Sequence, residues 1–524
     1  DVCSSDLLYM PPADFANAQR RSERRLERGN QTETPAETQS QMFTFFLRQA
    51  FLESSAGFRF SGLFSSAPPN YSILPNYYYH VTHFSSKKWP VFNTALEAYF
   101  DSQAQEEEPP FFRNFVGLTD EEKANIALQN NSLAQILQDS TQKEVQFAAL
   151  RNKGEYLFTF IESQLGEQNF RDFILNLLKQ NQFNDIDVTY FVNAIKSAYD
   201  YTFESSFENW YTGEQLPGYL VDDVEGYKVL DQDRTRFQVK FRMTNASSLA
   251  GLTTLHFRTG GRGRFFRPDA DEGVKKQIVL NGNETREIGV LLDQPARGMT
   301  IDTHISLNLP STLFYRFEEG EVNQKVSPFD GERIVEEPVS LFDNPDEIIV
   351  DNEDSTFKIL SFKQDTFLKR FISSRFGSAD DDEKYIGFFW WRPPNRWRAT
   401  TNSDFFGEFI HSAHYIKAGD GEKKVAWHTN LIENGNYDVY FYLSRTEVRS
   451  FGRRGHRENP VENLNYYVYH DDGVEHINFR TDSGLDGWNY LGSFYYSGGE
   501  TKIELSDESE GRLVIADAVK WVKR

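Results

Sequence analysis

Cysteine is nearly absent from this chain of 524 residues, in which Cys3 is the single one. One thiol excludes an internal disulfide, and avoidance of cysteine is compatible with an extracytoplasmic bacterial protein. Long apolar runs are missing as well, because no segment approaches the roughly 20 apolar residues that a membrane-spanning helix needs. We therefore expect no transmembrane segment in this chain and a periplasmic, cell-surface or secreted location.

Basic residues are in the minority, with 56 Lys and Arg against 78 Asp and Glu and a formal net charge of −22. A phosphate-binding surface needs concentrated Lys and Arg, so this balance argues against nucleic acid as a partner. The simplest interpretation is a solvated acidic surface that favours solubility.

The length predicts two to four domains, because a single core does not extend over so many residues. A hydrophobic content of 39% fits folded domains, and the 46 Phe and 25 Tyr suggest β-rich modules. The chain starts at Asp1 and not at a methionine, so we expect an N-terminally truncated fragment. The first residues of the segment 1–30 also resemble an artefact of sequence assembly, so Cys3 supports no inference about function.

Residues 31–219 are expected to form a mainly helical domain. Thr34 and Glu37 form one capping box with Pro35 at the first helical position, and Thr119 and Glu122 form another. Further helices are predicted at 143–165, 167–180, 188–199 and 203–211, from apolar residues at helical spacing.

The pattern changes near Gly218 to alternating strands punctuated by turns. Residues 237–243, 276–280 and 285–290 are predicted strands, and Asn281-Gly282-Asn283 predicts a hairpin between the last two. We expect an immunoglobulin-like β-sandwich over 220–340, a linker at 338–345, and a second all-β sandwich over 346–524.

The helical region is similar to the thermolysin-like catalytic domain of aminopeptidase N-type zinc metallopeptidases, which are gluzincins. Its landmarks are residues 79–83 in place of H-E-x-x-H, 92–96 in place of the segment with the third ligand, the Lys-Gly pair at 153–154, and the helical end at 165–170 and 207–210. The resemblance implies a remnant of the peptidase domain at the start of a multidomain chain.

The differences between this sequence and the family fall on the positions of the zinc ligands, the general base and the catalytic tyrosine. A gluzincin uses two His ligands and a Glu base from H-E-x-x-H, a third Glu ligand and a catalytic Tyr. By position, these roles would fall on Tyr79 for the first ligand, His80 for the base, Thr94 for the third ligand and Arg151 for the tyrosine, and only His83 matches. One histidine cannot hold zinc, and the Arg151 cation would repel it, so we expect no catalytic residue, metal or other cofactor.

Three alternatives stay open for this region. The chain is the C-terminal portion of an active zinc aminopeptidase whose metal helix lies upstream of Asp1, or it is an unrelated helical domain. A metal site on His80 and His83 is a third alternative, although no further ligand is evident.

The last region resembles the golvesin C-terminal domain, which is also described as similar to a xanthan lyase carbohydrate-binding domain. The sequence segments that resemble this family lie at 348–354, 426–427, 435–440, 467–473, 487–494 and 515–521. The family implies a β-sandwich in secreted or surface bacterial proteins, with a proposed binding role.

The ring-rich segment at 388–397 is the predicted ligand-binding patch of this last region. Exposed aromatic faces flanked by polar groups suit sugars, which offer apolar C–H faces and hydroxyl rims. The candidate residues are Trp390, Trp391, Arg392, Arg396 and Trp397. The alternative is that alternate rings belong to the sandwich core. The resulting hypothesis is a non-catalytic pseudopeptidase whose terminal module binds a glycan, a peptide or a cell-surface protein.

Overall fold

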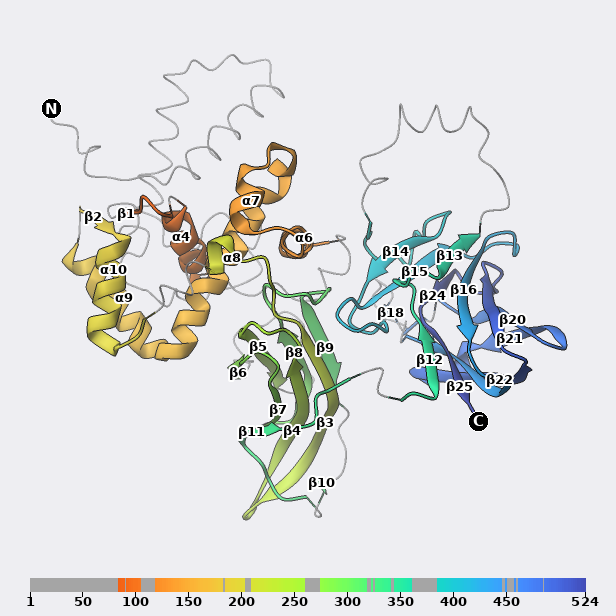
Figure 1. Ribbon diagram of the computed structural model, residues 1–524. Helices are drawn as coiled ribbons and strands as arrows, with labels where there is room; N and C mark the ends of the chain where they lie inside the picture. Colours follow the sequence, from red (N-terminus) through yellow and green to blue (C-terminus); the bar gives the residue numbers. More distant parts are fainter. Residues whose placement is uncertain are drawn as a thin grey trace.

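The computed structural model describes three connected parts, a helical part and two β-sandwiches (Figure 1). The described residues are 83–89, 91–104, 118–181, 184–202, 209–259, 274–317, 322–323, 326–340, 344–360, 384–444, 448–449, 457–458, 460–483 and 485–524. The helix predicted after Thr34 lies outside these residues.

The helical part packs its helices around one apolar core. The helices are α4 (Phe92–Ala104), α6 (Asp120–Leu128), α7 (Leu133–Gln138), α8 (Lys143–Leu165), α9 (Glu167–Gln180) and α10 (Val188–Tyr199), with a short turn of helix at 209–212. The predicted helices at 143–165, 167–180 and 188–199 are confirmed. None of the described helices combines the length and apolar character needed to cross a bilayer.

Local signals in the sequence set the ends of these helices. The Thr119 hydroxyl accepts from the Glu122 amide at 3.1 Å, and the Glu122 carboxylate accepts from the Thr119 amide at 2.8 Å, so the predicted capping box is confirmed. Gly166, with φ of +86°, ends α8 and starts α9, a conformation that glycine adopts without steric cost.

Helices α4 and α8 cross at Gly154, where there is no room for a larger side chain. A Cβ at this position would lie 2.5 Å from the Ala95 Cα. The neighbouring Lys153 is buried, its ammonium donates to the Gly213 carbonyl at 3.4 Å, and its own carbonyl accepts from the Trp210 indole at 2.7 Å. The Lys-Gly pair and the later Trp are therefore joined by packing and hydrogen bonds.

The first sandwich consists of two facing sheets. One sheet has the order β10-β3-β4-β7-β11, and the other has the order β6-β5-β8-β9. The strands are β3 (Tyr219–Asp231), β4 (Arg234–Asn245), β5 (Gly251–Thr259), β6 (Val274–Leu280), β7 (Thr285–Leu292), β8 (Ala296–Asp302), β9 (Thr312–Arg316), β10 (Val322–Asn323) and β11 (Gly331–Val335).

The hairpin predicted at Asn281-Gly282-Asn283 is wrong, because β6 and β7 lie in different sheets. The turn instead crosses between the sheets and packs on the connection from β4 to β5. The Asn283 amide donates to the Ser247 carbonyl at 2.8 Å, and a Cβ on Gly282 would lie 2.1 Å from the Ser248 carbonyl oxygen. The turn residues were recognised correctly, but the partner of each strand depends on contacts distant in sequence.

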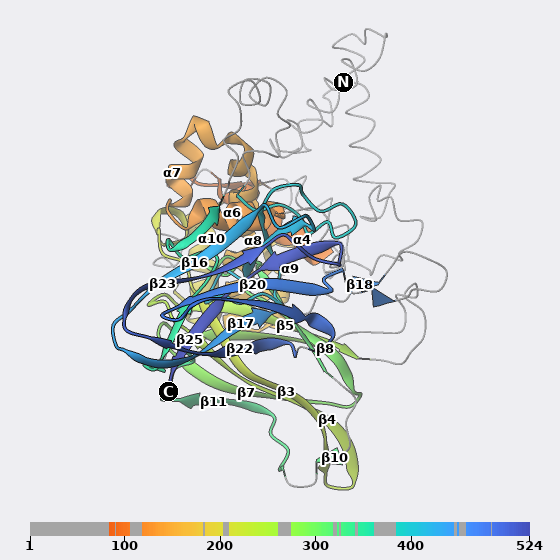
Figure 2. The same ribbon diagram turned by 90° about the vertical axis from the view of Figure 1, so that its right-hand side faces the viewer.

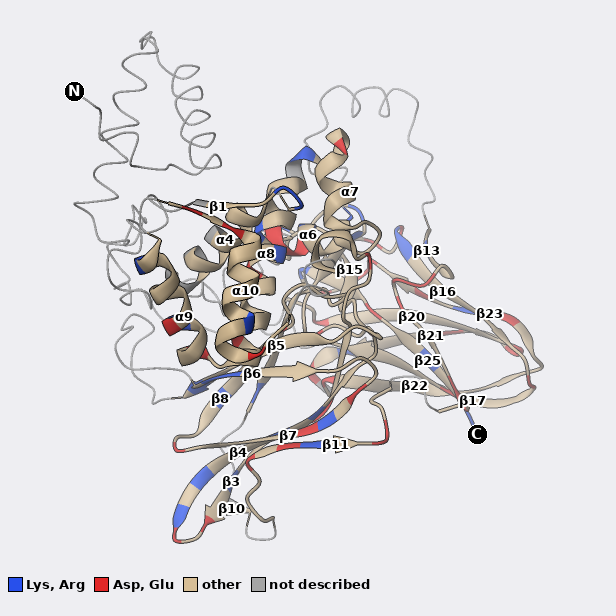
Figure 3. Cartoon of the chain, turned by 60° about the vertical axis from the view of Figure 1, so that its left-hand side comes forward, with Lys and Arg blue, Asp and Glu red and all other residues tan. Residues whose placement is uncertain are grey.

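Ion pairs cover the outer face of the sheet that contains β4, β7 and β11. Figure 3 shows basic and acidic residues interspersed along these strands. These ion pairs include Lys240 with Glu287, Arg242 with Asp223, and Arg286 with Glu332. Part of the charge of the chain is thus balanced locally on a solvated face.

The second sandwich packs a sheet of order β12-β25-β17-β22 against a sheet of order β13-β16-β23-β20-β21, seen as stacked layers in Figure 2. The strands are β12 (Glu347–Val350), β13 (Phe357–Leu360), β16 (Lys424–Leu431), β17 (Gly435–Leu443), β20 (Asn463–His470), β21 (Gly473–Arg480), β22 (Gly487–Tyr496), β23 (Gly499–Ser506) and β25 (Val519–Lys523). A third sheet joins β14 (Arg398–Thr401), β15 (Ser412–Lys417) and β24 (Leu513–Ala516), and β18 (Val448–Arg449) pairs with β19 (Arg457–Glu458). Trp427 and Trp521 are fully buried between the layers.

The connection from β8 to β9 belongs to the first sandwich and contacts both of the other parts. We call residues 303–311 the junction loop. Ile305 enters the core of the helical part, and Leu309 packs with Leu118 of the helical part and Tyr385 of the second sandwich. The Leu309 amide donates to the Phe409 carbonyl at 2.8 Å, and the Leu309 carbonyl accepts from the His411 amide at 2.7 Å.

Candidate functional site

The structure places three of the five residues that the peptidase resemblance singled out. His83 is the first residue of strand β1 (His83–Ser85), which pairs in parallel with β2 (Asp185–Asp187), so a helix does not run through it. Thr94 lies in the first turn of α4 and Arg151 in α8, where its guanidinium lies 5.7 Å from the Phe147 ring centroid. Tyr79 and His80 lie outside the described residues. A complete zinc site is therefore not described at these positions.

Helix α8 carries ionisable side chains that are buried where it faces the first sandwich. Burial raises the pKa of Glu155 to about 7, with Asp302 as a further cause, and raises that of Glu162 to about 7, with Glu167 as a further cause. Burial also lowers the pKa of Lys153 to about 8. Lys275 of β6 acts on both Glu155 and Glu162, whereas the ammonium of Lys153 lies at the Gly213 carbonyl. All three groups bear on stability through their shifted pKa values.

The predicted patch at 388–397 is only partly at the surface. Trp390 and Trp397 are 7% and 5% exposed and belong to the core of the second sandwich, which corrects their assignment as ligand contacts. Trp391 is 44% exposed, and Arg392 and Arg396 are exposed as well. Since the rings alternate between core and surface, only these last three offer surface to a ligand.

A larger group of rings lies on the outer face of the sheet β12-β25-β17-β22. We call Tyr440, Tyr442, Trp488 and Tyr490 the aromatic strip, and the buried ring of Phe406 packs against it. In the register of β17 and β22, Tyr440 is opposite Tyr490 and Tyr442 is opposite Trp488. The ring centroids of both pairs are 5.4 Å apart, and Phe406 lies 5.1 Å from Trp488. Tyr490 is 47% exposed, so the strip reaches solvent at that end.

Charged groups border the aromatic strip. The Lys520 ammonium lies 4.8 Å from the Trp488 centroid and 5.4 Å from the Tyr440 centroid, and it pairs with Glu347 at 3.1 Å. Burial raises the pKa of Tyr442, and the charges of Asp517, Asp404 and Asp486 raise it further. The rings of the aromatic strip therefore lie next to an ammonium and near carboxylates.

The outer face of the opposite sheet also carries tyrosines, but other side chains cover them. The Lys424 ammonium lies 3.9 Å from the Tyr467 centroid, and the His476 ring stacks on the same tyrosine at 4.7 Å. The Lys502 ammonium lies 4.2 Å from the Tyr469 centroid. Tyr467 and Tyr469 are both half-buried, whereas the aromatic strip includes Tyr490, which is 47% exposed.

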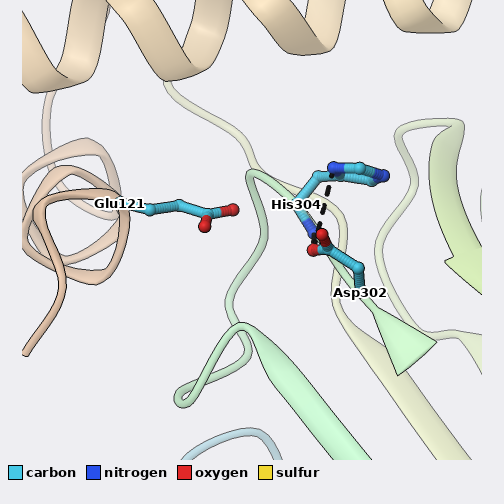
Figure 4. Close-up of side chains that lie close together, drawn as sticks. All are labelled: Glu121, Asp302 and His304. Carbon is cyan, nitrogen blue, oxygen red and sulfur yellow. Dashed lines mark hydrogen bonds and ion pairs between the residues drawn. The ribbon is translucent and has the colours of Figure 1, made fainter. Parts of the chain in front are cut away.

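A group of possible metal ligands lies where the helical part meets the first sandwich. Glu121 of α6, Asp302 of β8 and His304 of the junction loop each place one ligand-capable atom within 4.8 Å of the others. Figure 4 shows Glu121 pointing from its helix toward the Asp302 and His304 pair. Among the described residues, this is the group with the composition of a metal site.

Sequence reasoning missed both the aromatic strip and this ligand group. The alternation of Tyr440 with Tyr442, and of Trp488 with Tyr490, was a usable signal, because residues two apart on a strand share a face. Glu121 and His304 carry no such signal, since they are far apart in the chain and belong to different parts.

Residues 392–523 match the Golvesin C-terminal domain family. This agrees with the resemblance noted from the sequence for the second sandwich. The match covers a minor part of the chain, so it describes this module and not the whole protein. A comparison with curated proteins finds no match.

Several solved structures show weak similarity. A xanthan lyase from Paenibacillus is 16% identical with a TM-score of 0.24, over 59% of this chain and 26% of that one. The Legionella pneumophila aminopeptidase A, in complex with aspartic acid, is 13% identical with a TM-score of 0.24, over 46% of this chain and 28% of that one. The chain thus spans about a quarter of the length of each, and TM-scores this low do not establish a shared fold.

Proposed function

We propose that the second sandwich is a glycan-binding module and that the aromatic strip is its binding surface. The observation that carries this proposal is the pairing of Tyr440 with Tyr490 and of Tyr442 with Trp488 on one outer sheet face. Sugar rings stack on aromatic faces, and Asp404 and Asp486 would accept hydrogen bonds from sugar hydroxyl groups. The match to the Golvesin C-terminal domain supports a binding role for this module.

The test compares two surfaces of the same module. Binding of the full chain is first detected on a glycan array and then measured by calorimetry with the strongest ligand. We expect Trp488→Ala and Tyr490→Ala each to weaken binding at least about tenfold, which is about 1.4 kcal/mol. Tyr495→Ala is the matched control, because Tyr495 is a 44% exposed tyrosine on the same strand but outside the aromatic strip.

Trp391→Ala decides between this surface and the patch predicted from the sequence. If Trp391→Ala abolishes binding while Trp488→Ala and Tyr490→Ala leave it unchanged, Trp391, Arg392 and Arg396 form the site. The absence of binding to any glycan on the array would contradict the glycan-binding role itself.

We further propose that the helical part is a non-catalytic remnant of a gluzincin domain in an extracytoplasmic bacterial protein. Thr94 and Arg151 occupy the positions that the resemblance gives to the third zinc ligand and the catalytic tyrosine. A hydroxyl is a poor substitute for a carboxylate ligand, and a guanidinium next to the site would repel a cation. The joined Lys153, Gly154 and Trp210 support a retained scaffold.

The alternative is that this chain is the C-terminal portion of an active zinc aminopeptidase. The two hypotheses differ in activity on aminoacyl substrates such as an aminoacyl-nitroanilide. Hydrolysis that a chelator abolishes and zinc restores would overturn the non-catalytic role. Zinc content alone does not separate them, because a metal elsewhere in the chain would also be detected.

A further inference from the structure

The group formed by Glu121, Asp302 and His304 has the geometry of a metal site that is slightly open. Two ligand atoms that each lie about 2.1 Å from one ion are at most about 4.2 Å apart. Three ligand atoms that share one ion at this distance are about 3.5 Å apart, and the ligand atoms of these side chains lie within 4.8 Å of one another, so side-chain shifts of about 1 Å would let them share one ion. Their burial is intermediate, which leaves a path for an ion from solvent.

The imidazole of His304 forms a hydrogen bond with a residue outside the ligand group. Its Nε2 lies 2.8 Å from the Thr254 hydroxyl, and its Nδ1 lies 3.7 Å from the Asp302 carboxylate. When Nε2 donates to Thr254, the Nδ1 lone pair faces a carboxylate, and a cation between them makes that arrangement favourable. Metal-bound histidines commonly have their other ring nitrogen fixed in this way.

Asn125 provides an independent observation next to the same group. It lies one turn after Glu121 in α6, and residues four apart share a helix face. Its amide nitrogen donates to the His304 carbonyl at 2.9 Å, which fixes the amide against the junction loop. The side chain is fully buried, and among the described residues its Oδ1 has no hydrogen-bond partner. A buried acceptor without a donor is costly, and a cation would satisfy it.

We infer that Glu121, Asp302 and His304, next to the buried Asn125 side chain, bind a divalent transition-metal ion that joins the helical part to the first sandwich. One imidazole with two carboxylates suits Zn²⁺ or Mn²⁺. Ca²⁺ and Mg²⁺ favour sites made of oxygen ligands only, so the histidine selects against them. The site is distinct from the positions of the gluzincin resemblance and from the aromatic strip.

The test uses the full chain, stripped with a chelator and titrated with Zn²⁺ and separately with Mn²⁺ by calorimetry. We expect one equivalent of at least one of these ions to bind and to raise the melting temperature. His304→Ala and Asp302→Asn should each weaken binding at least tenfold. Thr254→Val, which is isosteric and does not touch the ion, should weaken it by about 10- to 100-fold.

Two further variants keep the test decisive. Glu121→Gln changes only the helical side of the site, so it replaces Asp302→Asn if that variant does not fold. His476→Ala removes an exposed histidine of β21 and should leave binding unchanged. The inference is overturned if neither ion binds, or if binding persists unchanged in both His304→Ala and Glu121→Gln, since the ion would then lie elsewhere.

Discussion

Glu162 is a buried residue whose ionisation opposes the fold. It is 4% exposed, and burial raises its pKa from an ordinary 4.5 to about 7. A carboxyl with a raised pKa in the folded state contributes full stability below its unfolded pKa and loses it as the pH rises through the folded pKa. Stability from this group is therefore lost between about pH 4.5 and pH 7.

Glu162→Gln should stabilise the protein at pH 8 and have little effect at pH 4. The amide cannot ionise, so the cost of a buried charge is removed, and we expect a gain of about 1–3 kcal/mol at pH 8. Chemical unfolding at both pH values measures the difference. Glu475→Gln, at an exposed position of β21, is the control and should change neither value. Equal effects of Glu162→Gln at pH 4 and pH 8 would contradict the pKa shift.

Single residues were predictable from the sequence where the cause was local. The capping box of Thr119 and Glu122 is confirmed because both partners lie within one turn. In contrast, Trp390 and Trp397 proved buried while Trp391 is exposed, because the side of the chain that meets the core depends on distant strands. The ligand group could not be predicted for the same reason, since tertiary contacts bring Glu121 to His304.

At the scale of elements, the crossing of α4 and α8 is a contact with little room for a larger side chain. Gly154→Ala places a Cβ 2.5 Å from the Ala95 backbone, so the helices must move apart. Alanine favours a helix by about 1 kcal/mol over glycine, but overpacking of this kind costs typically about 1–3 kcal/mol. We expect a net loss of stability, measured by chemical unfolding.

The control for Gly154→Ala is Ser163→Ala on the same helix, which removes one hydrogen bond to the Phe160 carbonyl and introduces no clash. We expect the control to change stability by less than about 1 kcal/mol. A stabilising effect of Gly154→Ala would show that the crossing is looser than the structure indicates.

Elements with a strong internal period were the most predictable. The helices at 143–165, 167–180 and 188–199 match their expected bounds, and the strand predicted at 237–243 lies within β4. Pairing was less predictable, as the supposed hairpin of β6 and β7 shows. A strong turn signal states that the chain reverses, but it does not state whether the next strand joins the same sheet.

At the scale of the whole molecule, the junction loop predicts that the three parts unfold together. Leu309 is 1% exposed and packs against residues of both the helical part and the second sandwich. Leu309→Ala should remove this shared contact at a cost of about 2–5 kcal/mol. In scanning calorimetry we expect one transition for the unchanged chain and two separated transitions for Leu309→Ala.

Leu313→Ala is the matched control, because Leu313 is 2% exposed but belongs only to the core of the first sandwich. It should lower the transition temperature without separating the transitions. If both variants separate the transitions, or neither does, the junction loop does not couple the parts.

The two backbone hydrogen bonds of Leu309, to Phe409 and from His411, also have a mechanical consequence. A force applied to a bound polysaccharide would enter through the second sandwich and leave through the rest of the chain. It would pass through these two bonds and the Leu309 contacts in parallel with the covalent connection at 336–346. The non-covalent route would yield first under load, because hydrogen bonds and apolar contacts are weaker than the covalent chain.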